Sequence, residues 1–472
     1  MSGERVFHRA SRVDVEADEL GAWHFREGAI IRLIPPWERI RVVREATPLV
    51  DGARAEIDIH KGPVSVRLIA EHEGVLPPRE FTDFQVRGPF GSWRHVHRFL
   101  PDPEGRAMIE DSIRFRPPLG AIGNLLAGRL MDREIARQFE FRHARTREDL
   151  RRHAELAARF GHGRMKIGVT GANGLVGRQL CAFLSTGGHE VVRFVRGVAA
   201  GPNERSWNPS DPRSGVAPDA VDGLDAVVHL AGEPIADGRW TEARKRAILE
   251  SRVHGTAAMA NAIARAARKP RAFVCASAIG YYGDRGSDWV DERSALGTGF
   301  LAEVVHAWES AAQPAADSGV RTVHARIGFV VSAAGGGLAR MLLPFKMGLG
   351  GPIGNGRQGM SWIALDDLIA LLAFAVMNDD LRGPVNAVAP GALPQRGFAR
   401  VLGRVLHRPA VAPLPAPIVR LVFGELGQRL LLEGAFVRPS VLAGAGFRFA
   451  YGDLEHALRL ELGRLHEGEV RA

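Results

Sequence analysis

Apolar and polar residues alternate in short runs over roughly residues 4–145, and prolines and glycines separate these runs. The clearest runs are 64–69, 81–86, 93–99 and 108–115. A period of two is typical of antiparallel strands with one buried face. Between Asn124 and Arg145, apolar residues such as Ile135 and Phe139 recur at helical spacing without a proline, which predicts a long amphipathic helix. One helix packed on a curved sheet gives an α+β helix-grip arrangement.

A different pattern begins at Met165, where the apolar run 165–170 leads into a glycine-rich turn and then a helical pattern. Further β-branched runs follow at 190–195, 226–230, 272–276 and 322–327, with helical patterns between them. Strands that read as continuous apolar runs are buried on both faces. Their alternation with helices predicts an α/β Rossmann domain with a doubly wound parallel sheet.

These patterns predict a multidomain protein. We expect a helix-grip domain at 1–150, a charged linker at 151–164, the Rossmann domain at 165–390, and a small, mostly helical C-terminal cap at 391–472. The length of 472 residues agrees with several domains, because one hydrophobic core stops growing near about 250–300 residues.

Composition narrows the class of protein. The chain is 46% hydrophobic and 24% charged, the usual balance of a globular protein. No stretch reaches about 18 uninterrupted apolar residues, and the amino terminus carries no apolar segment behind a basic start. Cys181 and Cys275 lie far apart in apolar segments, which indicates buried thiols and not a disulfide. We therefore expect a cytoplasmic protein without membrane insertion.

Charge excludes one class of partner. The 62 Lys and Arg residues exceed the 53 Asp and Glu residues, which gives a formal net charge of +9. The basic residues are spread thinly and mixed with acids at helical spacing, without a basic tail or an aromatic-interleaved stripe. The pattern indicates solvated helix faces, so we expect no nucleic-acid partner.

The glycine-rich turn after the first Rossmann strand predicts a dinucleotide cradle. Gly171, Gly174 and Gly177 stand between a strand and a helix, where backbone N–H groups and the helix dipole can hold a pyrophosphate. The end of a later strand contributes small residues that permit close approach to adenine and ribose. The expected cofactor-binding residues are Thr170, Gly171, Asn173, Gly174, Leu175, Val176, Gly177, Leu230, Ala231, Gly232 and Arg252.

The second Rossmann strand favours NADP(H) over NAD(H). NAD-selecting folds place an acid at its end to accept the ribose hydroxyls, and here the strand ends in Arg193-Phe-Val-Arg196. A guanidinium suits a 2′-phosphate. Arg193 and Arg196 differ in strand parity, and Arg196 is the better candidate; the alternative is a surface arginine.

Several motifs resemble those of the extended short-chain dehydrogenase/reductase superfamily, in its nucleotide-sugar epimerase branch. They are Val169–Gly177, His229–Gly232, Arg239–Thr241, Ser277–Gly283, Ala307–Glu309 and Gly359–Ile363. The stretch around Gly446–Phe449 is similar to the small C-terminal domain of unknown function of this branch. The amino-terminal segment, with Pro35–Glu38 and Gly88–Phe90, resembles the polyketide-cyclase/START-like (SRPBCC) ligand-binding superfamily, which implies a cavity for an apolar ligand.

The sequence departs from that superfamily at its catalytic positions. Extended members use a Tyr with a Lys four residues later as a proton donor, together with a Ser. The matching positions here are Leu301, Val305 and Ala278, with Ser277 one residue away from the usual serine. This lack of the dyad is shared by the branch that the sequence resembles.

Other residues are candidates for the missing roles. Ser277 lies at the carboxyl end of a predicted strand and Tyr282 follows it, in the region where Rossmann folds bind ligands, so both are our catalytic candidates. The alternative for Ser277 is a strand-end hydrogen bond to the backbone, and the alternative for Tyr282 is a packing or binding role. Glu309 serves as an acid or base only if its surroundings raise its pKa. The glycine-rich segment 348–359 is expected to be a substrate-closing lid. The expected substrate-binding residues are Lys245, Arg357, Gln358 and Trp362.

His95 and His97 share one strand face at a spacing that can make a metal pair. No third ligand is evident in the sequence, so we predict no metal site.

The sequence leaves two hypotheses of function. The first is an NADP(H)-dependent oxidoreductase or epimerase-like enzyme acting on a small molecule, either a nucleotide-sugar or an apolar ligand. The second is a non-catalytic sensor that couples NADP(H) to an apolar ligand of the amino-terminal domain. The sequence names neither the substrate nor the oligomeric state.

Overall fold

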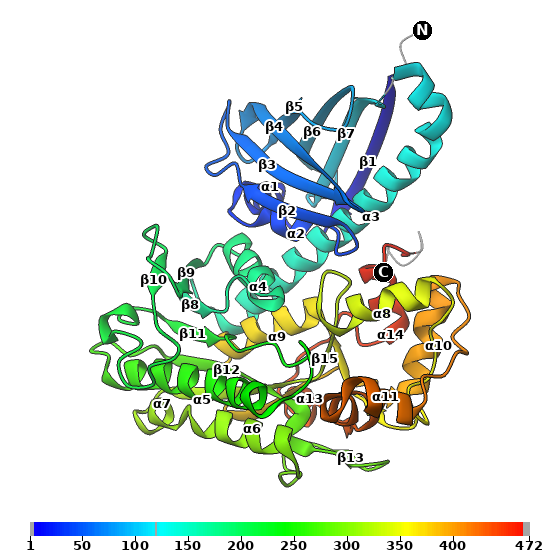
Figure 1. Cartoon of the computed structure of the whole chain (residues 1–472). Coiled ribbons are helices and arrows are strands. Elements are labelled where there is room, and N and C mark those ends of the chain that lie inside the picture. Colours follow the sequence, from blue (N-terminus) through cyan, green and yellow to red (C-terminus); the bar gives the residue numbers. More distant parts are fainter. Residues whose placement is uncertain (1–3, 119, 466–472) are drawn as a thin grey trace. The chain divides into compact units, whose positions relative to one another are not determined.

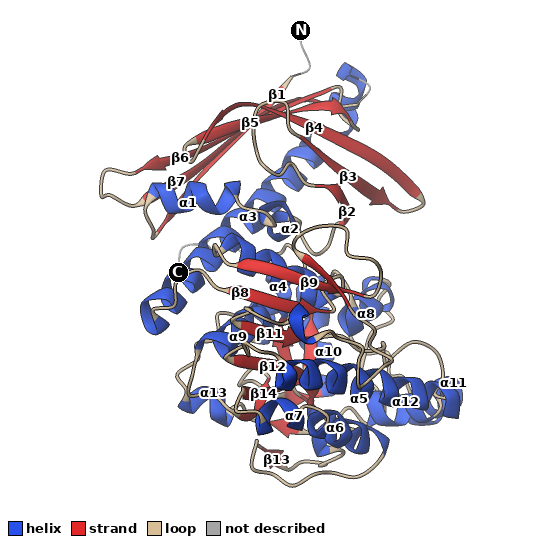
Figure 2. Ribbon diagram, turned by 90° about the vertical axis from the view of Figure 1, so that its left-hand side faces the viewer, coloured by secondary structure: helices blue, strands red, loops and turns tan. Residues whose placement is uncertain are grey.

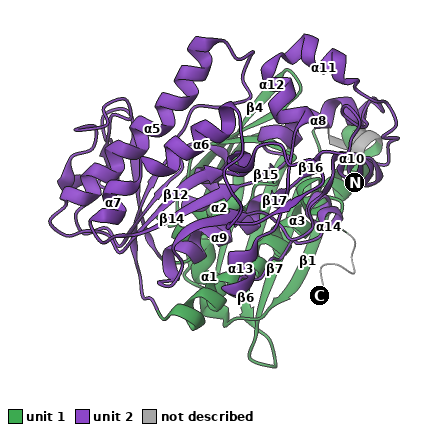
Figure 3. Cartoon of the chain, turned by 90° about the horizontal axis from the view of Figure 1, so that it is seen from below, with its two compact units in different colours: residues 1–161, 182–188, 460–472 green, residues 162–181, 189–459 purple. Residues whose placement is uncertain are grey.

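The computed structural model describes residues 4–118 and 120–465. The chain divides into two compact units (Figure 3). Unit 1 comprises Met1–Gly161, Ala182–Gly188 and Leu460–Ala472, and unit 2 comprises His162–Cys181 and His189–Arg459.

Unit 1 contains a curved, seven-stranded antiparallel sheet (Figure 1). The strand order is β1-β7-β6-β5-β4-β3-β2. The strands are β1 (Arg5–Val13), β2 (Arg39–Arg44), β3 (Arg54–Lys61), β4 (Val64–Leu76), β5 (Glu80–Arg87), β6 (Ser92–Pro101) and β7 (Ala107–Arg116). The four runs singled out in the sequence lie in β4 to β7. In β7, buried residues alternate with more exposed ones along the strand, so the period of two reflects one buried face.

The helices of unit 1 are α1 (Ala17–Phe25), α2 (Ala29–Leu33) and the 41-residue α3 (Gly120–Phe160). The predicted helix end near Arg145 and the linker from residue 151 are wrong, because α3 continues to Phe160. Charged residues at helical spacing support the extension: Arg151 pairs with Glu148 at 2.6 Å and with Glu155 at 3.0 Å. Between Arg145 and Gly161 the sequence contains neither proline nor glycine. Gly161, whose φ is +62°, ends the helix.

Unit 2 is built on a seven-stranded parallel sheet in the order β10-β9-β8-β11-β12-β14-β18. Its strands are β8 (Lys166–Thr170), β9 (Glu190–Val195), β10 (Glu204–Ser206), β11 (Ala226–His229), β12 (Ala272–Ala278), β14 (Arg321–Ile327) and β18 (Gly383–Ala387). The predicted Rossmann sheet is therefore confirmed. Of the seven strands of this sheet, only β10 and β18 lie outside the runs that the sequence predicts as strands.

Helices cover both faces of this parallel sheet (Figure 2). They include α4 (Leu175–Thr186), α5 (Glu242–Arg265), α6 (Phe300–Ser310), α7 (Gln313–Asp317), α8 (Gly336–Lys346) and α9 (Leu365–Met377). On one face Met259 and Ile263 of α5 pack with Val227 and Phe273 of the sheet, and all four are fully buried. This core holds α5 against the sheet.

The C-terminal region is mostly helical, as predicted. Its helices are α10 (Gln395–Leu406), α11 (Ala416–Phe423), α12 (Glu425–Gly427), the π-helical turn η3 (Gln428–Leu432), α13 (Ser440–Gly444) and α14 (Leu454–Glu461). Short pairings complete the fold: β13 (Trp289–Val290) with β20 (Phe436–Val437), β15 (Phe329–Val331) with β17 (Trp362–Ala364), and β16 (Gly359–Met360) with β19 (Leu393–Pro394).

The glycine-rich segment 348–359 is packed, and the lid expected from its composition is not observed. A β-carbon on Gly351 would collide with the backbone of Ala412, and one on Gly350 would collide with the ring of Phe345. Ile353 also bridges to Leu414. These glycines therefore allow neighbouring segments to pack closely against this one.

Cys181 and Cys275 are both buried and lie outside any disulfide. Within residues 4–118 and 120–465, no helix is long and apolar enough to cross a membrane.

Candidate functional site

The turn between β8 and α4 has the geometry of a phosphate cradle. Gly171 adopts a φ of +66°, in the left-handed region that favours glycine. A β-carbon on Gly177 would collide with the Gly171 carbonyl oxygen, so only glycine lets the first turn of α4 pack on this turn. Asn173 and Gly174 at the tip are exposed. The first N–H groups of α4 have no acceptors within the helix, and the dipole adds positive potential there. A dinucleotide pyrophosphate fits this cradle.

Thr170 supports the cradle from inside the protein. Its fully buried hydroxyl oxygen accepts hydrogen bonds from the backbone N–H groups of Leu230 (3.1 Å) and Ala231 (3.2 Å). The same hydroxyl lies 2.9 Å from Nδ1 of His229. The side chain of Thr170, an expected cofactor-binding residue, therefore ties the end of β8 to the end of β11. Burial lowers the pKa of His229 to about 4, so this ring is neutral near pH 7.

Arg196 follows β9 directly and is exposed. Within the described part of the chain, no hydrogen bond or ion pair engages its guanidinium. It is therefore available to an anion at the strand end where the sequence predicts the 2′-phosphate.

Arg252 lies beside the turn at Gly232. Its guanidinium carbon would be 3.5 Å from a β-carbon on Gly232, and it stacks over the Trp308 ring at 5.0 Å. One nitrogen donates to the carbonyls of Glu233 (3.0 Å) and Ile248 (3.1 Å). Burial lowers the pKa of Arg252 to about 10, and the side chain remains a cation near the cradle.

A charged network lies near the carboxyl ends of three neighbouring strands. Ser277 of β12 stands beside Arg326 of β14 in the sheet register. Both donate to Glu309 of α6: Ser277 Oγ at 2.6 Å, and Arg326 through Nε and a terminal nitrogen at 2.8 Å each. Burial alone would raise the pKa of Glu309, but the hydrogen bonds from Arg326 and Ser277 outweigh burial and lower it. Glu309 is therefore an ionised carboxylate, and the raised pKa that an acid role requires is not found.

Tyr282 belongs to the same network and has no free proton. Its hydroxyl donates to Asn386 Oδ1 at 2.7 Å and accepts from Arg326 at 3.1 Å, and the side chain is fully buried. Burial raises the pKa of the phenol. A buried phenol whose proton is already donated to Asn386 is unsuited to donate it to a substrate. The structure therefore does not support the catalytic role expected for Tyr282. The neighbouring Tyr281 stacks against Arg326, whose guanidinium lies 3.5 Å from the ring centre.

The positions of the missing dyad are apolar packing positions. A β-carbon on Gly280 would lie 3.4 Å from Leu301 and 3.8 Å from Val305. These side chains hold α6 against the 3-10 turn η2 (Ile279–Tyr282), which follows β12.

The expected substrate-binding residues lie in different environments. Lys245 is paired with Glu242 (3.3 Å) and Glu425 (3.2 Å), which raise its pKa. Arg357 is exposed. The Gln358 amide donates to the carbonyls of Ile353 (3.1 Å) and Leu431 (2.6 Å) and thereby pins its own segment.

Trp362 is fully buried, and its indole N–H donates to the Gly391 carbonyl at 3.0 Å. A ring with no exposed face cannot stack on a ligand, so Trp362 is a core residue and its expected substrate role is corrected.

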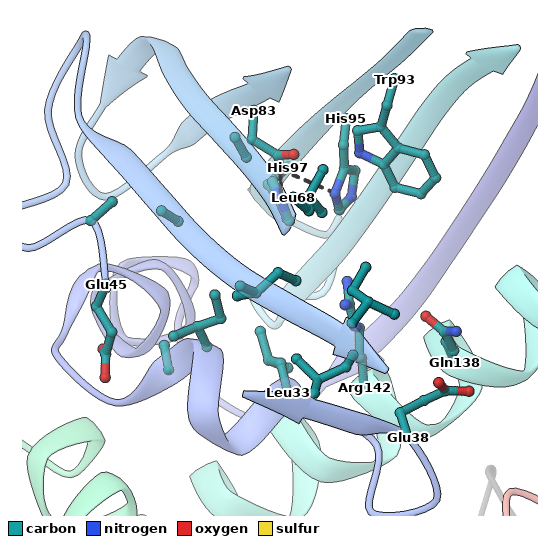
Figure 4. Close-up of a pocket in the computed structure, with 18 of the residues that line it drawn as sticks. Leu33, Glu38, Glu45, Leu68, Asp83, Trp93, His95, His97, Gln138 and Arg142 are labelled. Atoms are coloured by element: carbon teal, nitrogen blue, oxygen red, sulfur yellow. Dashed lines mark hydrogen bonds and ion pairs between the residues drawn. The ribbon is translucent and has the colours of Figure 1, made fainter. Parts of the chain in front are cut away.

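Unit 1 contains a second candidate site, a cavity of about 450 Å³ between the curved sheet and α3 (Figure 4). Aliphatic side chains such as Ile57, Val66 and Leu68 line it. Arg142 of α3 reaches into the cavity and is half-buried. No carboxylate among the described residues lies within ion-pair distance of Arg142, and its Nε is buried without a partner.

Sequence reasoning missed Arg326, Asn386 and Arg142. The first two become neighbours only through the order of β14 and β18 in the sheet, and no local motif marks them. Arg142 gives no signal among the many arginines of a charged helix.

The chain matches the sequence model of the NAD dependent epimerase/dehydratase family over residues 167–387. It also matches a domain of unknown function, DUF1731, over residues 414–460. An epimerase family protein of Mycobacterium bovis is 41% identical over 292 residues, which cover 62% of this chain and 96% of that protein. The chain therefore belongs to the epimerase family.

Within that family the chain is of the SDR39U1 type with a DUF1731 C-terminal domain. The human epimerase family protein SDR39U1 is 36% identical over 298 residues, covering 62% of this chain and 99% of the human protein. Its crystal structure with NADPH superposes with a TM-score of 0.59 over 64% of this chain and all of that one.

A crystal structure of the nucleoside-diphosphate sugar epimerase from Corynebacterium glutamicum matches with a TM-score of 0.80 and 32% identity. This match covers 97% of this chain and 90% of that one, so it includes the amino-terminal unit.

Proposed function

We propose that unit 2 binds NADP(H), with the pyrophosphate on the cradle of Gly171, Gly174 and Gly177 and the 2′-phosphate on Arg196. The observation that carries the proposal is the collision that a β-carbon on Gly177 would make with Gly171. The exposed Arg196 at the end of β9 favours the phosphorylated cofactor. The NADPH found with human SDR39U1 supports the same choice.

The proposed reaction is a nicotinamide-dependent oxidation and reduction of a small substrate, in the nucleotide-sugar class that the family's members suggest. The bound nicotinamide would exchange the hydride. Ser277 Oγ would accept a hydrogen bond from a substrate hydroxyl and position it, because its own proton is directed to Glu309 by a 2.6 Å hydrogen bond. Arg326 keeps Glu309 ionised and thereby fixes it as the acceptor of the hydrogen bond from Ser277. Arg252 and Arg357 would supply positive charge for an anionic substrate, whereas Lys245 is paired with Glu242 and Glu425.

A comparison of four variants tests this reaction. Ser277→Ala and Glu309→Gln should abolish substrate-dependent NADPH turnover while leaving NADPH affinity unchanged. Tyr282→Phe should keep most of the turnover, because its hydroxyl donates only to Asn386. Leu301→Ala serves as a packing control. Full turnover in Ser277→Ala would contradict the proposed role of Ser277.

Unit 1 is proposed to be a START-like ligand-binding domain of the helix-grip kind, covering about 1–150. The curved antiparallel sheet, the long α3 and the cavity of about 450 Å³ support this assignment. The apolar lining and the unpaired Arg142 favour an apolar ligand that carries an anionic group. A fatty acid and its methyl ester form a direct test, because only the acid can pair with Arg142. Equal affinity for the two would contradict the assignment of Arg142.

The alternative function is a non-catalytic sensor that couples NADP(H) to this ligand. The observations that favour it are the apolar Leu301 and Val305 at the dyad positions and the occupied hydroxyl of Tyr282. Coupling requires that one ligand change the affinity for the other by the same factor in both directions. Independent affinities for NADPH and the fatty acid would exclude the sensor.

A further inference from the structure

Two histidines and two aspartates form a closed cluster at one end of the unit 1 cavity. His95 and His97 lie in β6, Asp83 lies in the neighbouring β5, and Asp111 lies in β7 on the other side. Figure 4 shows Asp83, His95 and His97 turned toward one another. These three residues line the cavity.

The three cavity-lining residues offer one ligand atom each to a common point. Asp83 Oδ2 lies 3.3 Å from His95 Nδ1 and 3.1 Å from His97 Nε2, and the three ligand atoms all lie within 4.8 Å of one another. Atoms bound at about 2.0–2.1 Å in a tetrahedron around one ion lie roughly 3.3 Å apart. The two separations from Asp83 therefore match two edges of such a tetrahedron without a change of rotamer.

Asp111 contacts both histidines through the ring nitrogens that do not face Asp83. Its Oδ1 lies 2.8 Å from His95 Nε2 and 2.9 Å from His97 Nδ1, which are the ring nitrogens pointing away from Asp83. A histidine that binds a metal usually donates its other N–H to a carboxylate, which fixes the tautomer and the ring orientation. Here one carboxylate does this for both rings.

Asp111 is in turn held by His143. His143 Nε2 donates to Asp111 Oδ2 at 2.7 Å, and His143 Nδ1 lies 2.8 Å from Ser11 Oγ. His143 and Asp111 are both nearly free of solvent exposure. Contacts through Asp111 and His143 therefore fix the orientation of His95 and His97, and these contacts leave the nitrogens that face Asp83 uninvolved.

We propose that Asp83, His95 and His97 bind one divalent transition-metal ion at the end of the unit 1 cavity. Two imidazoles and one carboxylate suit Zn²⁺, Fe²⁺ or Co²⁺. Three protein ligands leave at least one coordination position, and the cavity supplies the space for it. The site is thus of the open kind, in which a water or a ligand oxygen completes the coordination. The proposal is independent of the cofactor site in unit 2.

The test uses the untagged full-length protein with Co²⁺ or Zn²⁺ as the only added ligand. Co²⁺ should give the visible d–d absorption of a four- or five-coordinate N/O site that saturates at one ion per chain. Calorimetry with Zn²⁺ should give the same stoichiometry with a Kd in the micromolar range or below. Binding weaker than the micromolar range for Co²⁺, Zn²⁺ and anaerobic Fe²⁺ would overturn the proposal and leave the cluster as a hydrogen-bonded packing element.

Variants separate a metal site from weak surface binding. His97→Ala and Asp83→Asn should weaken Zn²⁺ at least 100-fold, and Asp111→Asn should weaken it by about 10- to 100-fold. His72→Gln is the matched control, because His72 lines the same cavity but its Nδ1 pairs with the Ala53 carbonyl at 2.9 Å. An equal loss in His72→Gln would contradict the ligand assignment. If a ligand variant does not fold, the stoichiometry and Co²⁺ spectrum of the unaltered protein decide the question.

Discussion

Arg326 holds Glu309 through two hydrogen bonds of 2.8 Å in a setting where both side chains are largely removed from water. Planar two-point pairing is the strongest geometry available to an arginine and a carboxylate. Because Arg326 also donates to Tyr282 and stands beside Ser277 in the sheet, this one side chain connects helix α6, strand β12 and the turn η2. Loss of Arg326 should therefore disturb more than a single contact.

Arg326→Ala should lower the free energy of unfolding by about 3–5 kcal/mol, because the substitution leaves Glu309 buried without its cation. Urea denaturation at pH 7 measures the change. Arg340→Ala is the control, since Arg340 and Asp237 form an ion pair in which both side chains are more than half exposed; its cost should stay below about 1 kcal/mol. Similar losses in the two variants would contradict the importance given to Arg326.

Gly177→Ala should abolish NADPH binding. The added methyl group must displace the Gly171 carbonyl and with it the cradle. Calorimetric titration with NADPH measures the effect, and Gly163→Ala provides a control at a position where a β-carbon meets no atom within 4 Å. Unchanged affinity in Gly177→Ala would mean that the dinucleotide lies elsewhere.

Arg196→Ala should weaken NADPH selectively. A charge-assisted hydrogen bond contributes about 1.5–3 kcal/mol, which is roughly a ten- to hundredfold change in Kd. NADH lacks the 2′-phosphate, so its affinity should not change, and the ratio of the two affinities is the measured quantity. An equal loss for both cofactors would assign Arg196 to a general role in folding or in pyrophosphate binding.

His229 should make the stability of the protein depend on pH below 6.5. Burial lowers its pKa from 6.5 to about 4, so the unfolded chain binds a proton that the folded chain does not bind. The contribution is complete above pH 6.5 and is lost as the pH falls toward 4, by up to about 3 kcal/mol. His24, whose pKa burial lowers to about 3, adds a similar dependence from unit 1.

His229→Asn isolates this contribution. An asparagine oxygen can replace Nδ1 as the acceptor for the Thr170 hydroxyl, and it does not titrate. The difference in unfolding free energy between pH 7 and pH 4.5, measured with urea, should be smaller in the variant than in the unaltered protein. Equal differences would show that His229 does not titrate on unfolding.

Local sequence patterns predicted the elements well. The turn at Gly171–Gly177 carries both a strand-to-helix transition and its glycines within seven residues, and the alternation in β4 to β7 reflects one buried face. The continuation of α3 past Arg145 was missed because its exposed face is charged, which made it read as a linker. The packed segment 348–359 was misjudged because glycine serves close packing as well as flexibility.

The side-chain networks could not be predicted in the same way. Tyr282 and Asn386 stand more than 100 positions apart and meet only through the strand order. The sequence pointed to His95 and His97 as a pair, but the third residue, Asp83, comes from the neighbouring strand. Strand pairing and register decide such contacts, and no local spacing encodes them.

The most direct measurement is the calorimetric titration of the unaltered full-length protein with NADPH and, separately, with NADH. The cradle and Arg196 predict one NADPH per chain, with an affinity at least tenfold higher than that for NADH. Absence of binding by either dinucleotide, or tighter binding of NADH, would contradict the proposed function of unit 2.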